Sequence, residues 1–332
     1  MNDHAIEDAA RRATELAARG RAGDGYNLLL QAVGSGDGYA AATLADWRMA
    51  GEFIRRDLTE ARQLYGRALL LGVDEACGPY VALLASGAGG SGRDWQGALR
   101  LLEARQGWDA AARDQLSLLN AMPLSPQGEP QSTYHPQTLA THPRIEQLPA
   151  FLTAAECEYL QRIAAVHLAP ALIVDPRTGA LRRDPARLAR SAAFPFVTED
   201  PVLHAINRRI AAATGTRWEQ GEPAQVLAYD PGEEYRLHSD TLPPGGPQRI
   251  ITFLVALNED YEGGETSFPA IDLSWRGRRG DALMFHNVGS DGLPVAAAQH
   301  AGRPVRRGSK FILSRWIRER PLDLSGPPGR PF

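Results

Sequence analysis

Lysine is almost absent from this chain: Lys310 is the only one, and arginine supplies every other basic side chain. Cysteine is scarce too, and Cys77 and Cys157 fall in different predicted domains, which indicates reduced, buried residues and no disulfide framework. No apolar run is long enough for a membrane span, and the N-terminal stretch lacks the basic and apolar regions of a signal peptide. The net charge of −3 gives no reason to expect nucleic acid or a membrane as partner. These absences predict a soluble, cytoplasmic protein.

The first third of the chain is helical in its periodicity, and it repeats. Alanine and leucine recur at helical spacing over residues 5–120. Similar segments begin at Gly36, Gly72 and Gly107, which are 36 and 35 residues apart. Such a period is typical of helix-pair solenoids, with glycines ending the helices. The words LADWRMAG and RDLTEARQLYGRALLLGVDEA resemble a Sel1-like repeat, a relative of the tetratricopeptide repeat. Residues 1–120 are therefore predicted to be an all-α repeat domain, either a concave surface for a protein or peptide partner or only a scaffold packed on the second domain.

The composition changes after the repeats, which indicates a second domain. Residues 121–143 are rich in Pro, Ser, Thr and Gln, a composition typical of a linker. Residues 144–321 carry two helical patterns and then many short β-like runs separated by glycine and proline, which favours a double-sheet jelly roll or barrel. Residues 322–332 are expected to be a flexible tail. The fold class predicted is therefore multidomain α + β.

Individual elements of this second domain can be predicted from local pattern. A strand is expected from Arg144, and a helix over 152–168, where Thr153 and Glu156 form a capping box. A second helix is expected over 200–215. The β-like runs that follow cover residues 224–230, 234–240, 249–258, 265–269, 273–287, 296–302 and 309–317.

Four residues carry the strongest chemical signal: His238, Asp240, His300 and Lys310. Residues two apart on a strand face the same way, so His238 and Asp240 would point to one side together. Two histidines and one carboxylate are the facial triad of non-haem Fe(II) oxygenases, which leaves coordination positions open for small molecules. His300 and Lys310 are expected on two adjacent antiparallel strands, facing the same barrel mouth. An ammonium there suits one end of a dicarboxylate co-substrate.

With these residues in view, residues 144–321 resemble a 2-oxoglutarate- and Fe(II)-dependent dioxygenase of the prolyl 4-hydroxylase type. Several sequence segments match the family in order along the chain: FLTAAEC, LARSAAF, YDPGEEYRLHSD, RIITFLVALNEDYEGGETSFP, GRRGDALMFHN and QHAGRPVRRGSKFILSRWIRERP. The resemblance implies a double-stranded β-helix, or jelly roll, with flanking helices. It also implies Fe(II), 2-oxoglutarate and O2 as cofactors and co-substrates, and it leaves open whether ascorbate is needed.

The resemblance implies a role for each residue that matches the family's motifs. It gives His238, Asp240 and His300 as iron ligands and catalytic residues. Residues implied to bind or line the site of 2-oxoglutarate are Tyr229, Thr266, Lys310 and Trp316, with Lys310 and Tyr229 on the distal carboxylate. Those implied to lie nearer the substrate are Arg190 and Tyr235. One departure is the short, proline-rich segment TLPPGGPQ between Asp240 and Arg249, where the family carries substrate-covering loops.

Three functions remain open at this point. The first is hydroxylation of a residue, most simply a prolyl residue, in a protein or peptide that the helical repeats recruit, with release of succinate and CO2. The second keeps the oxygenase but gives it a free amino acid or small metabolite. The third is a repeat-based adaptor whose jelly roll is catalytically silent, and the intact ligand positions speak against it.

Overall fold

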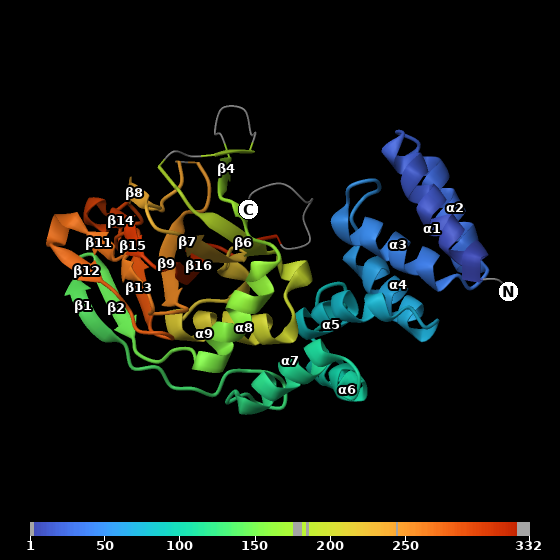
Figure 1. Ribbon diagram of the computed structural model, residues 1–332, viewed down its shortest axis with the longest axis horizontal. Helices are drawn as coiled ribbons and strands as arrows, with labels where there is room; N and C mark the ends of the chain where they lie inside the picture. Colours follow the sequence, from blue (N-terminus) through green and yellow to red (C-terminus); the bar gives the residue numbers. More distant parts are fainter. Residues whose placement is uncertain (1–2, 175–180, 184–185, 244, 324–332) are drawn as a thin grey trace. The chain divides into compact units, whose positions relative to one another are not determined.

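The computed structural model describes residues 3–174, 181–183, 186–243 and 245–323 (Figure 1). The described residues divide into two compact units. The helical unit holds residues 3–131, 196–206 and 323, and the β unit holds the described residues from 132 to 195 and from 207 to 322. The predicted tail lies outside the described residues from position 324 on.

The helical unit consists of successive helices, each packed against the next. Small alanines such as Ala40, Ala41 and Ala61, together with Leu29 and Leu44, fill a core that solvent does not reach. Burial of this apolar surface stabilises helices too short to persist alone in water. Before the β unit begins, the helices are α1 (Asp3–Ala18), α2 (Ala22–Gly34), α3 (Gly38–Ala50), α4 (Leu58–Leu70), α5 (Cys77–Ser86), α6 (Trp95–Arg105) and α7 (Ala110–Ala121).

Aspartate starts most of these helices. The side chains that accept a hydrogen bond from a first-turn backbone N–H are Asp37, Asp57, Asp94 and Asp109. Such caps satisfy donors that have no partner inside the helix. Gly36 and Gly72 have φ of 88°, as predicted for residues that end helices, whereas Gly107 is not among the glycines with positive φ. The Sel1-like assignment itself stays a prediction.

The β unit is antiparallel and has two main sheets. The larger has eight strands in the order β1-β2-β13-β9-β16-β7-β6-β3, and the smaller has four in the order β12-β11-β14-β8. The strands of the larger sheet are β1 (Gln137–Thr141), β2 (Arg144–Leu148), β3 (Ala169–Pro170), β6 (Arg190–Phe194), β7 (Ala224–Tyr229), β9 (Arg249–Ala256), β13 (Ala282–His286) and β16 (Lys310–Arg318). Those of the smaller are β8 (Tyr235–His238), β11 (Thr266–Phe268), β12 (Leu273–Trp275) and β14 (His300–Gly302). Two short two-stranded sheets complete the unit, β4 (Leu172–Val174) with β5 (Leu181–Arg183) and β10 (Glu262–Gly263) with β15 (Val305–Arg307).

The two main sheets share one apolar core. Phe268 of the smaller sheet packs edge-on against Phe285 of the larger, with ring centroids 5.0 Å apart, and both are fully buried. Trp275 and Leu254 belong to the same cluster. Two antiparallel sheets closed over one core are the arrangement of a jelly roll, which confirms the predicted fold class.

Two local expectations differ from the structure. Residues 137–141, inside the predicted linker, form β1, because their backbone pairs with β2 and extends the large sheet. The predicted run 273–287 is two strands in different sheets, β12 and β13. The chain turns between them where the Asp281 carboxylate accepts the Arg278 N–H, and Gly280 has φ of 90°.

The β unit also holds α8 (Ala154–Ala165), which packs on β6 and β7 of the larger sheet, and the residues of α9 (Pro201–Thr214) from Asn207 on. Both helices are close to their predicted positions. The capping box of Thr153 and Glu156 is present, as predicted. Glu156 also pairs with Arg209 at 2.9 Å, and both side chains are buried. In the part of the chain that the structure describes, no helix is long and apolar enough to cross a bilayer.

Candidate active site

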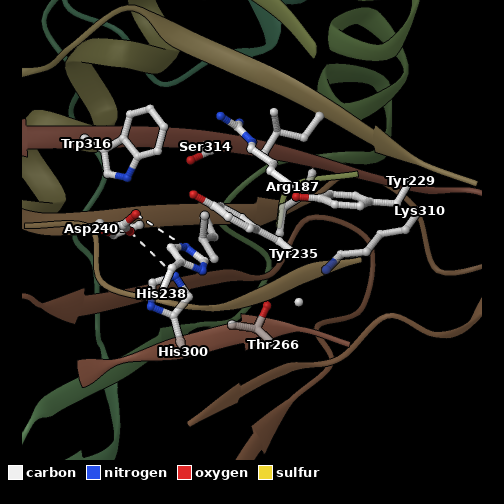
Figure 2. A pocket seen from close by; sticks show the side chains of 15 residues that line it. Arg187, Tyr229, Tyr235, His238, Asp240, Thr266, His300, Lys310, Ser314 and Trp316 are labelled. Carbon is white, nitrogen blue, oxygen red and sulfur yellow. Dashed lines mark hydrogen bonds and ion pairs between the residues drawn. The ribbon is translucent and has the colours of Figure 1, made fainter. Parts of the chain in front are cut away.

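Strand pairing brings His238 and His300 together. β8 and β14 are antiparallel neighbours in which His238 lies opposite His300, and the imidazole centroids are 4.3 Å apart. Asp240, just beyond β8, has one carboxylate oxygen 3.6 Å from the Nε2 of each histidine. A ligand atom from each of the three residues lies within 4.8 Å of the others (Figure 2). One strand pair thus brings together two histidines that are 62 residues apart in the sequence.

Both imidazoles are oriented by backbone carbonyls. The Nδ1 of His238 lies 2.8 Å from the Arg236 carbonyl oxygen, and that of His300 lies 3.1 Å from the Ala298 carbonyl oxygen. A carbonyl only accepts, so each Nδ1 carries a proton, and the nitrogen left to bind a metal is Nε2. Metal-binding histidines are commonly held in this way.

The charge states also suit a cation. Burial disfavours the charged form of Asp240, but the two histidines and the Thr252 hydroxyl outweigh it and hold the pKa of that carboxyl below its usual range. Burial lowers the pKa of His300 to about 4, so its imidazole is neutral at pH 7. A carboxylate and two imidazoles on one side of a pocket therefore fit Fe(II), with positions left for other ligands.

Lys310 marks the other end of the same site. It begins β16 directly opposite Tyr229 on β7, and its side chain is 4% exposed. The ammonium donates to the Gly264 carbonyl oxygen at 2.7 Å and lies 5.5 Å from the centroid of the Tyr229 ring. Burial lowers the pKa of Lys310 to about 8, although Glu265 opposes the shift. Its hydrogen-bond partner is a neutral carbonyl, so the carboxylate of a ligand would be a favourable charged partner for this ammonium.

The expectation that His300 and Lys310 lie on adjacent strands is wrong. β14 belongs to the smaller sheet and β16 to the larger, and β15 comes between them in sequence. The two side chains still enter one cavity, because the inner faces of the two sheets are opposed across it. This cavity, which opens to solvent, spans about 450 Å³ with part of that solvent included, and has the His–Asp–His cluster toward one end and Lys310 toward the other (Figure 2).

Most other residues singled out in the sequence also line this cavity. Tyr229, Thr266, Trp316 and Tyr235 are among its walls. Tyr235 stacks on His238, with centroids 3.5 Å apart and the rings 16° from parallel. The size and lining are those of a site for a small dicarboxylate beside a metal.

Arg190 is the exception. Its side chain is 41% exposed and forms an ion pair with Asp230 at 2.8 Å, and it is not part of the cavity wall. Arg187, three residues earlier, occupies the wall instead. Its guanidinium lies 5.4 Å from the Tyr235 ring centroid and 6.0 Å from that of Trp316. Arginine is too common in this chain for the sequence alone to mark it.

Two further residues were missed in the sequence, Thr252 and Asn287. The Thr252 hydroxyl donates to Asp240 at 2.6 Å, and the Asn287 amide donates to Thr252 at 2.9 Å. The neighbouring His286 does not line the cavity. Nothing in a threonine twelve residues after a ligand signals such a contact, because the contact depends on how β9 lies beside the end of β8.

Comparison with known proteins agrees with this geometry. The family model of the 2OG-Fe(II) oxygenase superfamily matches residues 224–318. Prolyl 4-hydroxylase 1 of Arabidopsis thaliana is 34% identical over 205 residues, which cover 56% of this chain and 72% of that protein. Prolyl 4-hydroxylase subunit alpha-1 of Rattus norvegicus is 31% identical over 194 residues, 56% of this chain and 36% of that one. The chain therefore belongs to the 2OG-Fe(II) oxygenase superfamily, as a homologue of the prolyl 4-hydroxylases.

Among solved structures, the viral collagen prolyl hydroxylase of Paramecium Bursaria Chlorella virus-1, in its 2OG complex, is similar. It has a TM-score of 0.43 and 26% identity, over 52% of this chain and 95% of that chain. Enzymes of the superfamily use Fe(II), 2-oxoglutarate and O2, so this protein is an Fe(II)- and 2-oxoglutarate-dependent dioxygenase.

Proposed function

We propose that this protein hydroxylates a prolyl residue of a protein or peptide, with 2-oxoglutarate and O2 consumed and succinate and CO2 released. The observation that carries the proposal is the placement of the His–Asp–His cluster and Lys310 at two ends of one cavity. The relatives named above are prolyl 4-hydroxylases, and they suggest the acceptor residue.

Different residues would bind Fe(II) and 2-oxoglutarate. His238, Asp240 and His300 would hold Fe(II), which together with 2-oxoglutarate supplies the oxidising chemistry. Lys310 would pair with the far carboxylate of 2-oxoglutarate, and Tyr229 and Thr266 stand beside that position. Charge is then balanced at both ends, because a dianion lies between a cation and an ammonium.

The remaining wall supports a substrate with oxygen acceptors. Within the described residues, the Nε of Arg187 and the Nε1 of Trp316 are buried donors without a hydrogen-bond partner. Buried donors of this kind are costly unless a ligand satisfies them. Peptide carbonyl oxygens are acceptors of the right type, and both donors belong to the cavity wall.

The first experiment separates the co-substrate from the substrate. Anaerobic addition of 2-oxoglutarate to Fe(II)-loaded protein should produce a visible charge-transfer band, and Lys310→Ala should weaken it. Proline-containing peptides and free proline are then offered with O2, and mass spectrometry follows oxygen addition to each. Oxygen on the peptide supports the proposal, oxygen on free proline only would replace it with the metabolite function, and a folded, metal-loaded protein without the band would refute the oxygenase.

The helical unit is proposed to recruit the protein substrate. Large apolar side chains stay exposed on it, among them Leu70 at 90% and Leu71 at 44%. Leu70→Ser should raise KM for a full-length protein substrate and leave KM for a short peptide unchanged. If Leu70→Ser changes KM for neither substrate, the helical unit is only a scaffold.

Two finer points are also proposals. A cytoplasmic location is supported by the two cysteines, which are free and buried. A need for ascorbate follows only from the family resemblance, and it is tested by counting turnovers before inactivation with and without ascorbate.

A further inference from the structure

The three ligand side chains of the metal site are held in two different ways. Each histidine is oriented by the backbone carbonyl two residues before it. Asp240 follows β8 of the smaller sheet and is held by a side-chain relay from the larger sheet, in which Asn287 contacts Thr252 and Thr252 contacts Asp240. All three residues of this relay are at most 5% exposed. Water therefore does not compete for these bonds.

The direction of the relay is fixed by chemistry. A carboxylate can only accept, so the Thr252 hydroxyl gives its single proton to the Oδ2 of Asp240. The Thr252 oxygen can then only accept, so Asn287 must present its Nδ2 to it, as the structure has it. Asn287 cannot turn away easily, because its backbone N–H donates to the Ile250 carbonyl and its own carbonyl accepts from Val295.

This relay acts on one carboxylate oxygen only. The Oδ2 of Asp240 takes the short bond of 2.6 Å from Thr252, whereas the Oδ1 takes no bond from the relay. Each oxygen lies 3.6 Å from one histidine Nε2, Oδ1 from that of His238 and Oδ2 from that of His300, so the relay is what distinguishes them. A donated proton withdraws electron density from Oδ2 and fixes the rotation of the carboxylate. Oδ1 is therefore the better donor to a metal.

We propose that Thr252, aligned by Asn287, is a positioning residue that makes Asp240 a metal ligand through a single oxygen. The consequence concerns free coordination positions. Two histidines and one oxygen leave three of six positions open, enough for the two oxygens of 2-oxoglutarate and for O2. A carboxylate bound through both oxygens would leave only two, and the co-substrates could not bind together. The inference rests on the proposed function only in requiring a divalent metal at this site.

The test uses the full chain and Mn(II) alone, without 2-oxoglutarate, O2 or substrate. The number of water molecules on bound Mn(II) is counted from line broadening by ¹⁷O-enriched water in the EPR spectrum. Three are expected in the wild type. Thr252→Val keeps the buried volume but removes the hydroxyl, and should bind two. Thr252→Ser restores the hydroxyl and should bind three.

Two more variants sharpen the result. Asn287→Asp puts an acceptor where the relay needs a donor, so the Thr252 proton turns to residue 287 and the count should fall to two. Ser267→Ala removes another buried hydroxyl, on β11 and outside the cavity wall, and should leave three. Circular dichroism in the near ultraviolet confirms that each variant is folded.

The outcomes are distinct. A count of three in Thr252→Val, with or without weaker Mn(II) binding, overturns the proposal, because the hydroxyl would then serve stability or orientation only. A count of two in both Thr252→Val and Ser267→Ala overturns it as well, since the effect would be general. A wild-type protein that binds no Mn(II) would refute the metal site and the proposed function together.

Discussion

Replacing Lys310 by methionine should make the protein more stable at neutral pH when 2-oxoglutarate is absent. The ammonium is almost fully buried, and its polar contacts in the structure are the Gly264 carbonyl and the face of Tyr229. Neither carries a full negative charge. Methionine has a similar length and no charge, so it fills the same space without the desolvation penalty.

The magnitude follows from the pKa of Lys310. Burial lowers this pKa from 10.5 to about 8, and each unit corresponds to about 1.4 kcal/mol, so the penalty is about 3 kcal/mol. Below pH 8 both folded and unfolded chains carry the proton, and the penalty is present in full. Between pH 8 and 10.5 only the unfolded chain keeps the proton. The free energy of unfolding of the wild type therefore rises with pH, and its difference from that of the variant shrinks.

Urea denaturation at several pH values from 7 to 10 measures this difference. Lys310→Met should exceed the wild type by about 3 kcal/mol at pH 7, and the gap should close toward pH 10. Arg303→Met, at an exposed position, serves as control and should show no such trend. Excess 2-oxoglutarate with metal should stabilise the wild type and not the variant. A gap that is absent at pH 7, or that does not change with pH, would falsify the reasoning about the buried ammonium.

Three further predictions concern the same cavity. Gly264→Ala should weaken 2-oxoglutarate binding about tenfold, measured by titration of the charge-transfer band, because φ is 68° and the new Cβ would lie 3.2 Å from Lys310. Asp240→Ala should abolish Mn(II) binding in calorimetry; unchanged affinity would contradict the metal site. Arg187→Met should raise KM for a peptide about 10- to 100-fold if the guanidinium bonds a carbonyl, and steady-state kinetics that show an unchanged KM would exclude that contact.

Several features were predictable because they depend on neighbours in sequence. His238 and Asp240 share a direction because they are two residues apart at the end of a strand. The capping box of α8 joins residues three apart, Thr153 and Glu156. The solitary Lys310 drew attention by composition alone. Matching to a known family then supplied roles for residues such as Tyr229.

Other features belong to the tertiary structure alone. Backbone hydrogen bonds between strands do not distinguish one side chain from another, so sequence could not say that β14 and β16 join different sheets. The same holds for Arg187, whose segment is placed beside Tyr235 by a single bridge, while Arg190 turns to Asp230. The relay that holds Asp240 joins the residues after β8, in the smaller sheet, to β9 and the end of β13, in the larger, so it depends on how the two sheets pack.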